Sequence, residues 1–278
     1  MSGPNQVKTR ENNKLTLLKL GGSLITDKEQ PNKARQKLIK GIAEEISQVI
    51  KSDVGLRIVL GHGSGSFGHV PAHKYGTRKG VRTRDEWEGF VEVWRAAGEL
   101  HMLVMGALDK AGIPAVSFPP SGVVTASDGR IACWDLTPLK SALKAGLLPV
   151  VYGDVAFDNV RGGTILSTED LFYHLTLHMH PGRILLAGVE PGVWGDYPAN
   201  TRVLDVITPE KYAVLDTKIL GSNAVDVTGG MSSKVKQNLD LVAKIQDLQV
   251  LIFSGLESGS ISKALLGEMH GTIIQAED

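Results

Sequence analysis

The chain has 278 residues and 42% of them are hydrophobic, which allows a core for one large α/β domain or two smaller ones. Thirty basic and thirty acidic side chains cancel, so the net charge indicates neither a nucleic acid nor a membrane surface as a partner. The single Cys133 excludes an internal disulfide framework, and no apolar run reaches the roughly 20 residues that a membrane span requires. We therefore expect a globular, cytoplasmic protein.

The first 14 residues are polar and lack the apolar segment of a secretory signal, so we expect a disordered N-terminal tail. Beyond it, apolar runs alternate with helical patterns, and this alternation predicts a mostly parallel sheet covered on both faces. No composition break marks a linker, so residues 15–278 are expected to form a single domain around one continuous sheet. The expected strands are residues 15–20, 56–60, 115–118, 147–152, 184–187, 250–253 and 272–274. Helices are expected around residues 38–50 and 83–112, the second opening with a capping-box spacing.

The first expected strand ends in a glycine-rich turn, LLKLGGSLITDK. Gly21 and Gly22 make the turn, Lys19 lies at the end of the strand, and Lys28 follows nine residues later. Two lysines beside exposed backbone N–H groups can hold a polyphosphate, because phosphoryl transfer depends mainly on positioning and on neutralising charge. The alternative is a tight turn with two solvated lysines.

The second turn, GHGSGSFGH, runs from Gly61 to His69 after the strand pattern LRIVL. It fails the dinucleotide fingerprint G-x-G-x-x-G because the third glycine would fall on Ser66, and it lacks the lysine of a Walker A motif. Backbone N–H groups in such a loop can approach an anion closely. Since His69 can add one hydrogen bond when neutral and two when protonated, the loop predicts a bound phosphate.

The other histidines leave further interpretations open. His62 lies beside the strand end, where it either contacts the anion or packs against its own loop. His69 and His73 have the i, i+4 spacing of a metal pair, but no third ligand is spaced to complete it. Three more histidines share a helical pattern without a nearby set of carboxylates, and we expect no metal there either: His174, His178 and His180.

Two acidic residues follow the apolar run LLPVVY, in the sequences GDV and STED. Asp154 and Asp170 could orient the lysines or, together with phosphates, hold Mg²⁺. Ser167 and Asp170 also have the spacing of a helix cap. The two interpretations of Asp170 are compatible.

The third turn, DVTGGMSSK, leads into an amphipathic helical pattern. Gly229 and Gly230 precede a helix N-terminus, whose free N–H groups and positive dipole favour phosphate. Lys234 lies in the first turn, where a lysine opposes the helix dipole and needs another reason for its position. An anionic ligand would supply that reason, and the alternative is a lysine that points into water.

The sequence resembles the amino acid kinase superfamily in four segments, and within it these segments look most like the isopentenyl phosphate kinases. The segments are KLGGSLITDK, HGSGSFGH, GDV and DVTGGMSSK. The segment GSFGH distinguishes kinases whose acceptor is a phosphate from members that phosphorylate a carboxylate or carbamate. The latter have no need of a histidine at an acceptor phosphate. The resemblance implies a three-layer αβα sandwich with a central, mostly parallel sheet, ATP with Mg²⁺, and a homodimer. It also implies an N-lobe, near residues 15–180, for the acceptor and a C-lobe, near 181–278, for the nucleotide.

The resemblance further implies roles for individual residues. The residues expected at the ATP phosphates are Lys19, Gly21, Gly22, Ser23, Gly65, Gly230 and Lys234. Those expected at the acceptor phosphate are His69, Ser64, Gly65 and Gly153. Lys28 would stabilise the transition state, and Asp170 would order the active-site lysines on the nucleotide side. The family's pocket for the acceptor tail lies among helices that here carry Phe90, Val91 and Trp94.

The reaction implied by the resemblance moves the γ-phosphoryl group of ATP onto isopentenyl phosphate or a related alkyl monophosphate. A phosphate monoester is already a nucleophile, so the lysines and Mg²⁺ serve to offset the repulsion between two polyanions. A fosfomycin-type phosphonate kinase shares the histidine, and a nucleotide-sensing module would keep the fold without catalysis. Acetylglutamate or uridylate kinase chemistry is disfavoured by His69. The sequence departs from the family pattern at residues 188–194, which read GVEPGVW. Many relatives carry a D-G-V-Y-like turn near the nucleoside at this place.

Overall fold

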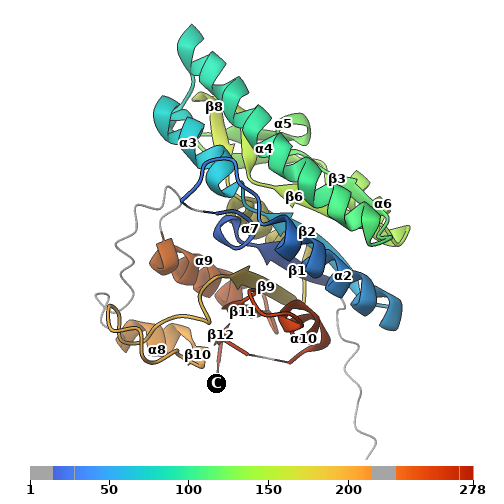
Figure 1. The fold of residues 1–278 in the computed structure, drawn as a ribbon. Coiled ribbons are helices and arrows are strands. Elements are labelled where there is room, and N and C mark those ends of the chain that lie inside the picture. Colours follow the sequence, from blue (N-terminus) through green and yellow to red (C-terminus); the bar gives the residue numbers. More distant parts are fainter. Residues whose placement is uncertain (1–14, 28, 215–229, 269, 278) are drawn as a thin grey trace, which may run out of the picture.

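The structure is a computed structural model and describes residues 15–27, 29–214, 230–268 and 270–277. Strands and helices alternate along the chain and pack as three layers, with a sheet between two groups of helices (Figure 1). This is the αβα arrangement that the resemblance implied. The expected tail at residues 1–14, together with Lys28 and Gly229, lies outside the described residues.

The central sheet has eight strands. Their bounds are β1 Leu15–Leu20, β2 Arg57–His62, β3 Ala115–Ser117, β6 Leu148–Tyr152, β9 Arg183–Gly188, β10 Val206–Ile207, β11 Gln249–Ser254 and β12 Thr272–Ile274. Their order is β10-β12-β11-β9-β1-β2-β6-β3, and every neighbouring pair is parallel except β11 and β12. All seven expected strands lie in this sheet, which is continuous from the first expected strand to the last, and β10 is the strand that the sequence did not predict.

A second, four-stranded sheet was not expected from the sequence. It consists of β4 Val124–Ser127, β5 Arg130–Trp134, β7 Asp154–Asp158 and β8 Gly162–Leu166, in the order β5-β4-β7-β8. Its strands are short, three of them have glycine or a charged residue at an end, and β5 is largely exposed, so none forms a long apolar run. The expectation of a single sheet was therefore incomplete.

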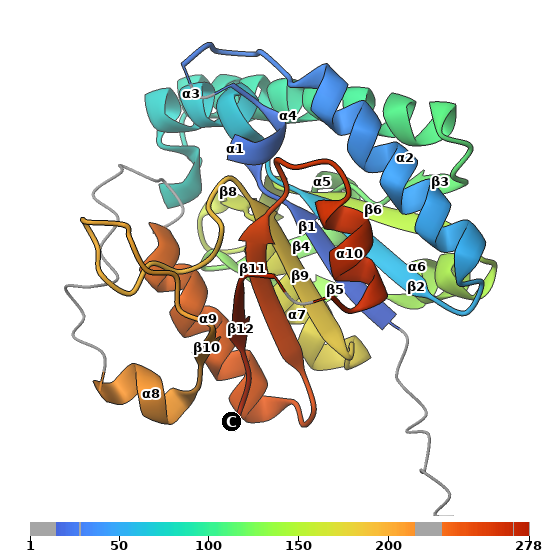
Figure 2. The same ribbon diagram turned by 60° about the horizontal axis from the view of Figure 1, so that its bottom comes forward.

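Helices cover both faces of the central sheet (Figure 2). One face packs against α2 Gln36–Ser52, α4 Arg84–Lys110 and α10 Ser260–Leu266. The other face packs against α6 Thr137–Lys144, α7 Thr168–Met179 and α9 Gly230–Lys244. The remaining helices are α1 Gly22–Ile25, α3 Gly65–Tyr75, α5 Pro120–Val123, α8 Pro209–Val214 and the 3-10 helix η1 Thr77–Lys79. None of the helices in the described part of the chain has the length and apolar character needed to cross a membrane.

Two predicted helix starts are confirmed by reciprocal hydrogen bonds. At α4, the Thr83 hydroxyl accepts from the Glu86 N–H and the Glu86 carboxylate accepts from the Thr83 N–H. At α7, Ser167 and Asp170 form the same pair of bonds. A capping box satisfies N–H groups that have no partner inside the helix, so each helix starts at a defined residue.

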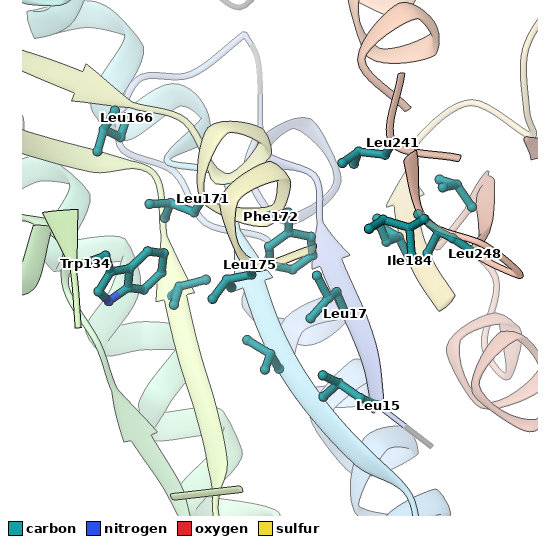
Figure 3. Close-up of a cluster of buried hydrophobic side chains, with 14 of the residues drawn as sticks. Leu15, Leu17, Trp134, Leu166, Leu171, Phe172, Leu175, Ile184, Leu241 and Leu248 are labelled. Atoms are coloured by element: carbon teal, nitrogen blue, oxygen red, sulfur yellow. The ribbon is translucent and has the colours of Figure 1, made fainter. Parts of the chain in front are cut away.

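Strand β1 is buried on both faces, and its side chains alternate between these faces. This alternation places Lys19 at the cavity described below. Leu15 and Leu17 pack in the cluster around α7 and α9, as Figure 3 shows, whereas Leu18 and Leu20 pack in the cluster around α2 and α4. Burying each leucine stabilises the fold by roughly 1.5–3 kcal/mol. Because side chains two residues apart share a face, Lys19 follows Leu17 to the α7 side at the C-terminal end of the strand.

Candidate active site

A cavity of about 580 Å³ lies at the C-terminal ends of β1, β2 and β9. The carboxyl ends of parallel strands are where ligands bind in sheets of this type. Ten residues expected from the sequence lie together in its wall: Lys19, Gly21, Gly22, Ser23, Ser64, Gly65, His69, Gly153, Gly230 and Lys234. Lys28 lies outside the described residues, and Asp170 is placed differently from the expectation.

The first two glycine-rich turns contact each other through their backbones. A Cβ atom on Gly22 would lie 2.5 Å from the backbone nitrogen of Gly65, and Gly65 has a positive φ of 51°. The Thr26 hydroxyl joins the turns, since it donates to the Gly22 carbonyl at 2.7 Å and accepts from the Ser66 N–H at 3.0 Å. Side chains at these glycines would push the turns apart, so glycine is required for the shape of the cavity floor.

Three helices begin at the cavity, and each begins at a glycine that lines it. These are α1 at Gly22, α3 at Gly65 and α9 at Gly230. N–H groups in the first turn of a helix have no intrahelical acceptor, and the helix dipole makes this end positive. The arrangement suits a phosphorylated ligand and explains how a loop without the lysine of a P-loop can bind one.

Glu169 holds Lys19 in the cavity wall. The Lys19 ammonium donates to the Glu169 carboxylate, and both side chains are mostly buried. Burial alone would raise the pKa of Glu169, but the charges of Lys19 and Lys234, with the hydrogen bond from Lys19, hold this pKa below its ordinary value. Glu169 is therefore ionised and lies within the field of both lysines. The sequence analysis did not identify this residue.

Asp170 differs from its expected role. Its Oδ2 atom accepts from the backbone N–H and the hydroxyl of Ser167, at 2.8 and 2.7 Å, and from the Arg78 guanidinium at 3.1 Å. Among the described residues, the carboxylate that orders Lys19 belongs to Glu169, whereas Asp170 caps α7 and holds Arg78. Arg78 lines the cavity, and no motif of the sequence pointed to it.

Asp154 does not line the cavity, contrary to the suggestion that it orients the lysines. It is buried in the second sheet, where it accepts from the Ser121 hydroxyl and the Val155 N–H, both at 2.8 Å. Burial raises its pKa to about 6. Within the described parts of the chain, no group of three or more His, Cys, Asp or Glu side chains is arranged to hold a metal ion.

In one part of the cavity wall, His69 lies among apolar side chains. His69 lies in α3 with an exposed side chain, and Val70, Ala72, Val93 and Ile165 contribute to the same wall. The sequence had pointed to three residues of α4 at this place. The structure puts Phe90 in a buried cluster beside Val93, whereas Val91 and Trp94 face outward with exposed fractions of 44% and 49%.

The loop GVEPGVW forms another part of the cavity wall. Gly188, Val189, Glu190, Val193 and Trp194 line it. The Trp194 ring N–H donates to the Glu190 carboxylate at 2.8 Å, which closes the loop on itself. The loop thus contributes five residues to the cavity wall.

The remaining histidines do not line the cavity. His62 is fully buried behind the second turn, where its ring contacts Gly63 and His101. His174 and His178 stack on each other along α7, with ring centroids 4.0 Å apart. His62 therefore fits the packing interpretation rather than direct contact with a ligand.

The profile of the amino acid kinase family matches residues 14–254, and the chain belongs to this family. Its relatives include the isopentenyl phosphate kinase of Methanocaldococcus jannaschii, which is 34% identical over 266 residues, with 94% of this chain and 98% of the relative covered. The isopentenyl phosphate kinase of Methanothermobacter thermautotrophicus is 35% identical over 273 residues, with the same coverage of 94% and 98%. A solved isopentenyl phosphate kinase structure superposes with a TM-score of 0.78 at 32% identity, covering 94% of this chain and 100% of that one. The resemblance read from the motifs and the expected fold are thereby confirmed.

Proposed function

We propose that the protein transfers the γ-phosphoryl group of ATP to isopentenyl phosphate and forms isopentenyl diphosphate. The observation that carries this proposal is a single cavity that joins three helix N-termini and two lysines to a histidine beside an apolar wall. The names of the relatives support it, since they are isopentenyl phosphate kinases.

The two phosphorylated ligands are assigned to opposite sides of the cavity. Lys19 and Lys234, with the turns at Gly21–Ser23 and Gly230, would bind the nucleotide phosphates. His69 would bind the acceptor phosphate, with Ser64, Gly65 and Gly153 around it. Of the groups assigned to the nucleotide, Gly230 and Lys234 belong to the expected C-lobe, whereas Lys19 and the turn at Gly21–Ser23 belong to the expected N-lobe. The contact between Gly22 and Gly65 brings the nucleotide and acceptor sides together.

The chemistry consists of bringing two polyanions into contact. The acceptor phosphate is itself the nucleophile, so the protein supplies fixed positive charge and N–H dipoles where charge shifts during transfer. Lys28 keeps its expected role at the transition state as a prediction. The cavity wall offers ammonium groups rather than a carboxylate cluster, so Mg²⁺ would be carried by the nucleotide phosphates, where it would neutralise charge.

Arg78 is a further cation for the acceptor side. Its guanidinium lines the cavity and is oriented by Asp170 at 3.1 Å, and a guanidinium matches the geometry of phosphate oxygens. Replacing Arg78 with Gln is expected to raise KM for isopentenyl phosphate about tenfold, with a smaller change in KM for ATP. Arg84→Gln is the matched control, since its side chain is exposed and pairs with Glu88 on the helix surface. Equal changes in the two KM values for Arg78→Gln would contradict this role.

The apolar wall favours an alkyl acceptor over the small polar acceptor of a fosfomycin-type kinase. ATP consumption should be measured with isopentenyl phosphate, dimethylallyl phosphate, fosfomycin, glutamate and uridylate. We expect turnover with the two alkyl phosphates. Turnover with fosfomycin alone would favour the phosphonate kinase, and ATP binding without turnover of any acceptor would favour a nucleotide-sensing module.

A homodimer and a cytoplasmic location stay predictions. The first can be checked by measuring the molar mass in solution, and the second by locating a tagged full-length chain in cells.

A further inference from the structure

Two buried histidines lie directly behind the second glycine-rich turn, and the mechanism above does not use them. His62 ends β2 and is 0% exposed, and His101, from α4, is 4% exposed. His62 Nδ1 lies 3.1 Å from the Gly63 carbonyl oxygen, and its Nε2 lies 3.0 Å from Nδ1 of His101. His101 Nε2 lies 2.7 Å from the Ser117 hydroxyl. The four groups form one chain of hydrogen bonds from β3 to the turn.

The direction of each hydrogen bond follows from the chemistry of its ends. A carbonyl oxygen only accepts, so Nδ1 of His62 carries the proton. A neutral imidazole has one N–H, so His62 Nε2 accepts from Nδ1–H of His101, and His101 Nε2 accepts from Ser117. Burial lowers the pKa of His62 to about 4, and burial together with the neighbouring His62 lowers that of His101 to about 3. Both rings are therefore neutral near pH 7, and one arrangement of protons satisfies the chain.

The groups that contact this chain directly are an aromatic ring, a hydroxyl and a backbone N–H group. The Tyr152 ring stacks on His101 with centroids 4.1 Å apart and an interplanar angle of 16°. The Tyr152 hydroxyl interacts with the carboxyl of Asp154. The His62 carbonyl accepts from the Thr168 hydroxyl at 2.6 Å and from the Gly153 N–H at 3.0 Å.

The hydrogen bond to Gly63 decides the orientation of the next amide. Its carbonyl turns towards the His62 ring, which lies behind the cavity wall rather than in it. In a planar trans peptide the N–H points opposite to the carbonyl, so the Ser64 N–H points towards the cavity. Gly63 and Ser64 both line that cavity.

We propose that His62, His101 and Ser117 form a positioning relay that aims the Ser64 amide at the bound phosphate. The identity of that phosphate as the acceptor rests on the proposed function, whereas the relay itself rests on these contacts. Neither histidine touches the ligand, and both act through the Gly63–Ser64 peptide.

The proton arrangement is tested first, because it needs neither a variant nor an activity. Nitrogen-15 NMR of histidine side chains in the full chain should show both His62 and His101 with the proton on Nδ1, and both neutral at pH 6. Assignment uses the loss of signals in His62→Asn and His101→Asn. A proton on Nε2 of His62, or a charged His62 at pH 6, would overturn the relay.

The effect on the turn is tested with a pair of variants at one position. His62→Leu removes the donor to Gly63, whereas His62→Asn keeps an N–H close to the position of Nδ1. We expect His62→Leu to lower kcat about ten- to a hundredfold, because misplacing a donor by about 1 Å has an effect of that size, and to weaken binding of isopentenyl phosphate measured by calorimetry. His62→Asn should recover most of both. Equal defects in the two variants would overturn the proposal.

A milder variant covers the case in which His62→Leu does not fold. Ser117→Ala removes the outermost donor, and Ser47→Ala is its control, since the Ser47 hydroxyl donates to the Ala111 carbonyl at 2.8 Å far from the cavity. We expect Ser117→Ala, and not Ser47→Ala, to shift the nitrogen-15 resonance of His101 Nε2, which loses its donor, and to lower kcat about threefold or more. Identical behaviour of the two would overturn the relay. If the wild-type chain does not turn over isopentenyl phosphate, the proposed function fails, while the NMR signature still decides whether the relay exists.

Discussion

Glu169 supplies a buried negative charge beside the lysines of the active site. Its carboxylate pairs with Lys19 and lies in the field of Lys234, so it partly neutralises both positive charges. The ion pair also fixes the position of Lys19 before a nucleotide binds. A fixed lysine stabilises a transition state better than a mobile one, because no reorganisation is needed during transfer.

Glu169→Gln keeps the size of the side chain and removes its charge. We expect kcat to fall about tenfold or more, because Lys19 is no longer held, with a smaller change in the free energy of unfolding. Steady-state kinetics and urea denaturation measure the two effects. Glu44→Gln is the control, since Glu44 forms an exposed i, i+4 pair with Lys40. A Glu169→Gln variant with wild-type kcat would exclude this role.

His69→Ala tests the acceptor side. The imidazole is assigned to the acceptor phosphate alone, so its removal should lower kcat/KM for isopentenyl phosphate about a hundredfold, as for other lost donors, and leave ATP affinity within about threefold. His73→Ala, one turn further along α3 and outside the cavity wall, is the control. Equal losses for both ligands would count against the assignment.

At the scale of elements, the second sheet holds part of the cavity wall, since Gly153 precedes β7, Ile165 lies in β8, and Ser167 follows β8. Asp158, at the end of β7, stabilises two turns of this sheet, one between β4 and β5 and one between β7 and β8. Its buried carboxylate accepts backbone hydrogen bonds of 2.7–3.0 Å from Asp128, Gly129, Val160 and Arg161.

Asp158→Ala should destabilise the protein by about 2 kcal/mol, because several backbone N–H groups lose their acceptor at once. Urea denaturation measures the change. Asp128→Asn provides the comparison from the same turn: its side chain is exposed and pairs with Arg161, so its effect should stay within about 0.5 kcal/mol. Similar stabilities for both variants would show that the turn does not depend on Asp158.

At the scale of the whole molecule, buried histidines make stability depend on pH. The pKa values of His62 and His101 in the folded chain, about 4 and about 3, lie below the value of 6.5 expected in the unfolded chain. As the pH falls below 6.5, the unfolded chain therefore binds protons first and stability is lost. Asp154 acts in the opposite direction, because burial raises its pKa to about 6 and the folded chain takes up that proton first.

Burial and His178 likewise lower the pKa of His174 to about 4, so three histidines act against one carboxyl. The net loss in the free energy of unfolding between pH 7 and pH 5 is about 4 kcal/mol. Urea denaturation at the two pH values measures it. His101→Asn should be less stable at pH 7 and show a smaller loss on going to pH 5, because one titrating group is gone. The same pH dependence in wild type and His101→Asn would contradict this account.

Much of the site could be predicted because its signals are local in the sequence. A glycine-rich turn next to an apolar strand or a helix start indicates exposed backbone N–H groups. All three such turns contribute to the cavity wall. Lys19 was found for the same reason, since a charged residue at the end of a buried strand stands out. The two capping boxes are equally short-range, and both are present.

The rest was decided by tertiary structure, because it depends on how elements are rotated against each other. Glu169 and Asp170 are neighbours on α7 and point in directions about 100° apart, so the packing of the helix decides which one meets Lys19. Gly61 permits that packing, since a Cβ atom there would lie 2.6 Å from both Thr168 and Phe172. The contact between His62 and His101 spans 39 positions of the chain, and no local pattern contains it.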